Sequence, residues 1–119
     1  FGPLSERNFK QKINKKMNKK AVKLCLTGKV TEEKLVVLEN VPATGKTKDM
    51  AALRKMLPGD GKTTLIVVEE VDDTAALALR NIPRVHMQRA HDVNVVDLLH
   101  HQYIIVTKSG VETLESRLA

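Results

Sequence analysis

Four short runs of mainly apolar residues, many of them β-branched, alternate along this chain with segments of helical character. We predict strands at 35–39, 64–68, 85–88 and 103–107. A strand that is apolar at every position is typically buried on both faces of its sheet. Parallel strands need long crossovers, which helices supply. The pattern therefore predicts an α/β protein, a small three-layer fold with a mainly parallel four-stranded sheet and helices on both faces.

The predicted helices fill the intervals between the strands, and several begin at recognisable capping residues. They are expected at 10–27, 47–57, 75–81 and 95–100, with a last helix after residue 109. Asp72 and Asp73 precede the third helix, and their position explains the two carboxylates as caps rather than as an acid–base pair. Asn94 is predicted to cap the fourth helix. Ser109, with Glu112 three residues later, has capping-box spacing for the fifth.

The length of 119 residues predicts one globular domain spanning 1–119. Within it we expect an irregular lead-in at 1–9, a basic helix at 10–29 and an alternating β/α body at 30–119. No apolar run approaches the length that crosses a membrane. The lone Cys25 is expected to be a small core residue, and one cysteine permits no intramolecular disulfide.

The stretch 7–29 holds nine basic residues and no acid. Its apolar residues recur at helical spacing, which predicts one stripe facing the core, and Gly28 is expected to end the helix. The predicted core stripe is Phe9, Ile13, Met17, Ala21 and Leu24. The opposite face would carry Lys12, Lys15, Lys16, Lys19 and Lys23. A solvated helix face usually mixes charges of both signs, whereas this face is uniformly positive, which favours an anionic polymer as its partner.

The net charge of +6 is concentrated at one end of the chain. Residues 1–29 carry nine bases and one acid, whereas 30–119 carry eleven bases and thirteen acids. The three aromatic residues are too few for base stacking, so nucleic-acid binding would depend on charge and backbone contacts. The absence of Trp and the weak apolar stripe favour nucleic acid over a membrane surface.

Gly45-Lys46-Thr47 follows a strand and opens a helix, as in a phosphate-binding P-loop, but the pattern is incomplete. The position five residues before Gly45 is Asn40 rather than glycine, and Pro42 removes a backbone donor. Two interpretations remain for Lys46, Thr47 and Lys48. They form either a phosphate-binding helix start with free N–H groups, or a solvated helix start.

No catalytic, cofactor or metal site is predicted. The four histidines (His86, His91, His100 and His101) lack metal-ligand spacing and are expected at the surface or near RNA. No serine stands in a nucleophile motif. Arg80 and Asn81 end a helix. They either complement its dipole or form a pair at a loop mouth that touches RNA or a neighbouring loop.

Several segments, taken in order, resemble one family. The chain is similar to the large-subunit ribosomal protein L-four (uL-four) family, bacterial type, over essentially its whole length, and Phe1-Gly2-Pro3 resembles the segment that follows that family's long loop. The segments are Gln11–Met17, Lys46–Lys48, Ala78–Pro83, Asn94–Leu99, Ile105–Thr107 and Leu114–Ala119. The family's N-terminal segment and tunnel loop precede this point, so we expect a truncated or minimal member.

The resemblance implies a non-enzymatic structural constituent of the large ribosomal subunit. Such a protein binds ribosomal RNA near its five-prime end and supports early subunit assembly. Expected partners are large-subunit ribosomal RNA and neighbouring large-subunit proteins, with no membrane, cofactor or small-molecule substrate. The expected location is a ribosome, cytoplasmic or organellar. The resemblance points to Lys15, Lys16, Lys46, Thr47, Lys48, Arg80 and Asn81 for RNA contact, and the charge pattern adds Arg7, Lys12, Lys19, Lys20 and Lys23.

Two other classes of function remain open from the sequence. One is a small nucleotide-binding enzyme that uses the 40–47 loop, which the missing glycine argues against. The other is a protein-interaction module whose basic helix binds a protein partner.

Overall fold

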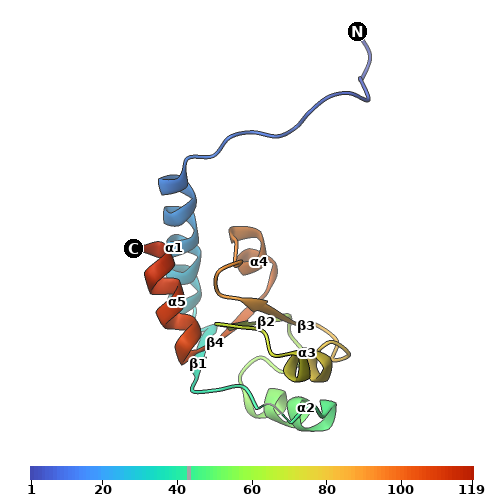
Figure 1. The fold of residues 1–119 in the computed structure, drawn as a ribbon, viewed down its shortest axis with the longest axis vertical. Coiled ribbons are helices and arrows are strands. Elements are labelled where there is room, and N and C mark those ends of the chain that lie inside the picture. Colours follow the sequence, from blue (N-terminus) through green and yellow to red (C-terminus); the bar gives the residue numbers. More distant parts are fainter. Residues whose placement is uncertain (43) are drawn as a thin grey trace.

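The computed structural model describes residues 1–42 and 44–119 and confirms the predicted α/β class (Figure 1). Nine elements alternate along the described chain, in the predicted order. They are α1 (Lys15–Thr31), β1 (Leu35–Leu38), α2 (Thr47–Met56), β2 (Thr64–Val68), α3 (Asp73–Leu79), β3 (Val85–Arg89), α4 (Val95–His100), β4 (Tyr103–Thr107) and α5 (Lys108–Leu118). Residue 43, within the predicted 40–46 loop, lies outside the described residues.

The four strands form one sheet in the order β1-β4-β2-β3, and every pair is parallel. β2 and β4 are the interior strands. Ile66 at the centre of β2 pairs with Ile105 of β4 on one side and Met87 of β3 on the other. All five residues of β2 are buried, as the continuous apolar run predicts. Parallel order requires a helical crossover between consecutive strands, and α2, α3 and α4 supply these connections.

Helices cover both faces of the sheet (Figure 1). Leu65 and Val67 of β2 point to one face, where they pack with residues of α1, α4 and α5. Ile66 and Val68 point to the opposite face, where they pack with residues of α2 and α3. Successive side chains of a strand alternate between faces, so one apolar run fills two cores. The predicted three-layer arrangement is therefore confirmed.

Two predicted helix caps are confirmed and one is wrong. The Asp72 side chain accepts a hydrogen bond from the Thr74 N–H at 3.3 Å, and Asn94 Oδ1 accepts from the Asp97 N–H at 2.9 Å. α5, however, is capped by Thr107, whose Oγ1 accepts from the Gly110 N–H at 3.1 Å. The last residue of β4 is already extended and carries a hydroxyl, so the helix begins directly after it, and Ser109 lies inside the first turn.

The basic helix begins and ends later than predicted. Residues 10–14 precede α1 and are not helical, and the helix passes through Gly28 to Thr31. Glu33 takes the left-handed conformation that usually favours glycine, with φ of 58°. The Lys34 N–H donates to the Lys29 carbonyl at 2.9 Å, and the Glu33 N–H donates to the Val30 carbonyl at 3.0 Å. These two bonds form a Schellman motif with glutamate in the glycine position.

The buried side of α1 is also not the predicted stripe. Val22 is fully buried, and Cys25 and Leu26 pack against the same core. Met17 and Leu24 are each 62% exposed, and Phe9 and Ile13 are also exposed. The first half of α1 extends beyond the sheet, where it has no layer to pack against (Figure 1). The helix meets the core only after about residue 20, through the positions 22, 25 and 26.

Candidate nucleic-acid interface

All twelve residues predicted to contact RNA are exposed, but they lie in three separate places. One group lies on the N-terminal arm, residues 1–14, and on α1; a second is at the start of α2, and a third is at the end of α3. The first group is Arg7, Lys12, Lys15, Lys16, Lys19, Lys20 and Lys23, the second is Lys46, Thr47 and Lys48, and the third is Arg80 and Asn81.

The arm and the first turns of α1 form the most basic exposed segment of the described chain. Every residue from 1 to 20 is exposed, and these twenty residues hold seven bases and one acid. The arm leads away from the sheet as an irregular, extended segment (Figure 1). Across residues 1–42 and 44–119, ion pairs join only Lys34 to Glu32 and Arg89 to Asp92. No described carboxylate therefore neutralises this segment through an ion pair.

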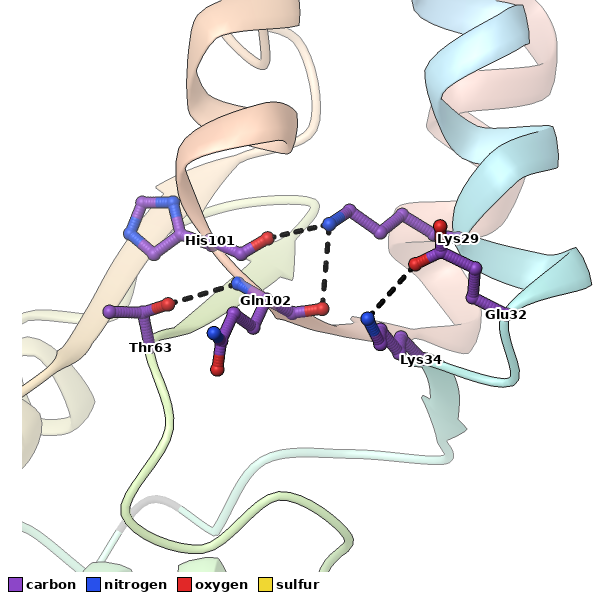
Figure 2. A network of polar contacts seen from close by, with 6 residues as sticks. All are labelled: Lys29, Glu32, Lys34, Thr63, His101 and Gln102. Carbon is purple, nitrogen blue, oxygen red and sulfur yellow. Dashed lines mark hydrogen bonds and ion pairs between the residues drawn. The ribbon is translucent and has the colours of Figure 1, made fainter.

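The opposite end of α1 is fixed to the body by a lysine (Figure 2). Lys29 Nζ donates to the His101 carbonyl at 2.8 Å and is 3.4 Å from the Gln102 carbonyl. The Gln102 N–H donates to Thr63 Oγ1 at 3.0 Å, which ties the same connection to the start of β2. Beside it, Lys34 lowers the pKa of Glu32 by a hydrogen bond and by its charge. Lys29 thus holds the helix in place.

The start of α2 offers the predicted free N–H groups but stands among carboxylates. Lys46 precedes the helix, and no side chain of the described chain caps it. A Cβ on Gly45 would lie 3.8 Å from the Thr74 Cβ, so the starts of α2 and α3 are neighbours. Asp72 and Asp73 begin α3, and Asp49 lies in the first turn of α2. These acids oppose the binding of a phosphate at Lys46–Lys48.

The carboxyl ends of the strands, where α/β folds usually bind ligands, are acidic. A cavity of about 230 Å³ opens there, and Glu69, Glu70 and Asp72 are among its lining residues. Across the described positions, no group of three or more His, Cys, Asp or Glu is arranged to hold a metal ion. A nucleotide's phosphates would meet repulsion at this end of the sheet.

Arg80 and Asn81 lie at the other end of the sheet. Arg80 is the C-cap residue of α3, and the chain turns there toward the start of β3. Because all strands are parallel, the start of β3 is opposite the edge at which α2 begins. The structure therefore does not bring Arg80 and Asn81 together with Lys46–Lys48.

Sequence reasoning missed Arg54, which is the most buried basic side chain described. It is 5% exposed and lies on the inner side of α2. Its guanidinium donates to the carbonyls of Pro58, at 3.0 Å, and Gly59, and to Thr64 Oγ1 at 2.6 Å. Desolvation lowers the pKa of Arg54, against the opposing charges of Asp60 and Tyr103. Its position one residue after Leu53, on the apolar side of the helix, was the available signal.

The sequence suggested that the histidines lie at the surface or near RNA, but one of them, His101, is buried. His101 is 5% exposed, and its Nδ1 lies 2.7 Å from the Asp97 carbonyl oxygen. A carbonyl only accepts, so Nδ1 of His101 donates to it. His86 Nδ1 lies 2.9 Å from His101 Nε2, within hydrogen-bond distance. These hydrogen bonds join the end of α4 to β3.

Two further findings bear on function. No helix among the described residues has the length and apolar character needed to span a membrane. A family model described as "Ribosomal protein L4/L1 family" matches residues 1–117. The match includes the arm, α1 and every residue predicted to contact RNA.

Proposed function

The chain belongs to the ribosomal protein L4/L1 family and is a protein of the large ribosomal subunit; we propose that it binds ribosomal RNA mainly through its N-terminal arm and the exposed half of α1. The observation that carries this proposal is the segment 1–20, in which every residue is exposed and seven bases accompany one acid. Phosphate neutralisation by such a segment releases counterions and supplies affinity without base readout.

The geometry of α1 supports contact with several phosphates at once. Lys15, Lys16, Lys19, Lys20 and Lys23 lie on nine consecutive helical positions, over about 12 Å of helix at 1.5 Å per residue. Arg7 continues the positive charge into the arm, where its guanidinium carbon lies 4.6 Å from the centre of the Phe9 ring. A helix holds these ammonium groups in a fixed pattern, which reduces the entropy lost on binding.

The start of α2 takes a smaller part in this proposal. Lys46, Thr47 and Lys48 contribute free N–H groups and two charges, while the neighbouring Asp49 and Asp72 weaken the positive potential. The contact is proposed to lie near the five-prime end of the large-subunit RNA and to act early in assembly, beside other ribosomal proteins. The role is structural, within a ribonucleoprotein that serves translation.

Residues 1–119 are proposed to act as one domain. Both cores share the central sheet, and α1 contributes Val22 to one of them. The basic helix is therefore part of the folded body, although its first turns extend beyond it.

The test is binding of the chain to a transcript of the five-prime domain of large-subunit ribosomal RNA, with a structured RNA of equal length as competitor. Lys15→Gln together with Lys16→Gln should lower the slope of log affinity against log salt by about 1.8, since each duplex phosphate contact contributes about 0.9. The matched control is Lys34→Gln with Lys108→Gln, which removes the same charge from the body.

Preference for the ribosomal transcript and a reduced slope only in the first pair support the proposal. Equal slopes in the two pairs would remove α1 from the contact. Absence of binding to either RNA would refute the proposed function.

A further inference from the structure

A second group of exposed bases lies at the end of the sheet where β2 and β3 begin. We name these four residues the basic rim: Lys55, Lys62, Arg80 and Arg84. Lys55 lies in the last turn of α2, Lys62 lies just before β2, and Arg80 and Arg84 flank the connection from α3 to β3. None of the four takes part in either ion pair found in residues 1–42 and 44–119.

Direct contacts bring the rim residues together. Arg84 Nη1 donates to the Gly61 carbonyl at 2.9 Å, which places it beside Lys62. A cavity of about 170 Å³ is lined by Arg54, Lys55, Asp60, Lys62 and Pro83, among others. A neighbouring cavity of about 480 Å³ shares Pro83 and has Arg80 and Arg84 in its wall. The four side chains therefore border one continuous, hollowed surface.

The wall of the smaller cavity includes a buried positive charge, Arg54, which forms no ion pair among the described residues, although the charge of Asp60 acts on it. Arg54 is 5% exposed, and its three acceptors, two carbonyls and the Thr64 hydroxyl, are neutral. Its Nε is buried and has no hydrogen-bond partner among the described residues. A buried charge without an ion pair costs free energy, and an anion in the adjoining space would reduce that cost. Asp60 is the one acid in the cavity lining, against Arg54, Lys55 and Lys62.

The opposite end of the sheet has more acids than bases, although Lys46 and Lys48 also lie there. Its acids follow β1 and β2 or begin α3: Glu39, Glu69, Glu70, Asp72 and Asp73. Residues 30–119 are close to neutral in total, yet the charge is separated between the two ends of the strands. This separation of charge favours an orientation in which the basic rim faces a polyanion.

We propose that the basic rim is a second RNA-contact surface, and that its 170 Å³ cavity takes one backbone phosphate. This inference depends on the proposed function, because it names a further site for the same polymer. It differs from the α1 contact in place and in chemistry: α1 presents exposed ammonium groups along a helix, whereas the rim adds a cavity with the buried guanidinium of Arg54 in its wall. Two contact surfaces on one folded body would hold two RNA segments at a set separation, and linked contacts strengthen each other.

The experiment uses the whole chain and the same five-prime-domain transcript. Lys55→Gln with Lys62→Gln should lower the salt slope by about 0.7 to 0.9, because both lysines line the cavity that takes one phosphate. Lys34→Gln with Lys108→Gln again serves as the control. In a variant that combines the rim pair with the α1 pair, the two reductions in salt slope should add, because the two surfaces are separate. Unfolding curves of each variant verify that Gln at these exposed positions leaves the fold intact.

A second readout needs no substitution. Lysine acetylation of the free and RNA-bound chain, located by mass spectrometry, should show protection of Lys55 and Lys62 by RNA, while Lys108 stays reactive. An unchanged slope in the rim pair, or equal acetylation of Lys62 with and without RNA, would overturn the rim proposal. If the α1 pair still loses slope in those same experiments, the proposed function stands and the rim alone is rejected. If the unmodified chain binds no RNA, both the proposed function and the rim proposal are rejected.

Discussion

Gly59 and Gly61 form a matched pair that separates backbone strain from steric overlap in the loop that carries Lys62. Both have positive φ, 80° and 77°. A Cβ on Gly61 would meet no atom within 4 Å, whereas a Cβ on Gly59 would lie 2.6 Å from the Cγ of the Tyr103 ring. The Cγ is the attachment point of the ring, so a small rotation of the side chain does not relieve the overlap.

The two alanine variants should therefore differ in stability. Gly61→Ala should lower the free energy of unfolding by about 1 kcal/mol, the cost of a Cβ in the left-handed region. Gly59→Ala should add about 1–3 kcal/mol of overpacking against Tyr103. The chain has no Trp, so urea unfolding followed by far-ultraviolet circular dichroism is the assay. Each kcal/mol corresponds to roughly 4 °C in Tm for a domain of this size.

A third variant tests the cause. Introducing Gly59→Ala into a Tyr103→Ala background should cost no more than Gly61→Ala costs in the native chain, because the ring is gone. Equal losses for the two glycines, or an undiminished loss without the ring, would refute the steric argument.

Three other predictions follow from particular contacts. Val22→Ala should lower the free energy of unfolding in urea by about 2 kcal/mol, because two buried carbons are removed and a cavity remains. Leu24→Ala should change it by no more than about 0.5 kcal/mol. A larger loss for Leu24→Ala than for Val22→Ala would contradict the observed packing and favour the stripe predicted from the sequence. Asp72→Ala should cost about 1 kcal/mol by removing a helix cap, and unchanged thermal unfolding would contradict that role. Lys34→Gln should raise the pKa of Glu32 toward its ordinary value, read by carbon NMR titration of the carboxyl. A lowered folded-state pKa gives stability that is present above the unfolded-state pKa and lost as the pH falls through the folded-state pKa, so the variant should show a shallower acid limb.

The interior strands were predictable because β2 and β4 are apolar on both sides, and that pattern depends on burial alone. Thr64 to Val68 needed no knowledge of neighbours to be identified as an interior strand. The buried side of α1 was not predictable in this way. Its sequence has two apolar stripes, one through Met17 and Leu24 and one through Val22 and Leu26. The choice between them depends on where the sheet ends, which is a property of the fold.

The candidate site was predictable in charge but not in arrangement. The exposed lysines of α1 were predictable because residues 7–29 carry bases and no acid. The separation of Lys46 from Arg80 was not, because it follows from the direction and order of the strands. Arg54 shows a further limit. A basic residue on an apolar helix side gives no sequence signal of its acceptors, which belong to the loop at Pro58 and Gly59 and to the first residue of β2.

The anchoring of α1 at one end has a mechanical consequence. The seventeen residues of α1 form a helix about 25 Å long. It is held to the body near Val22 and Lys29, and its end near Lys15 makes no contact with the core. A force that a bound partner exerts on the free end is transmitted through the helix to the connection between α4 and β4, where Lys29 is hydrogen-bonded. The direction in which the outer lysines point is set by the phase of the helix at its fixed end. One residue inserted between them would turn the free end by about 100° while the anchor stayed in place.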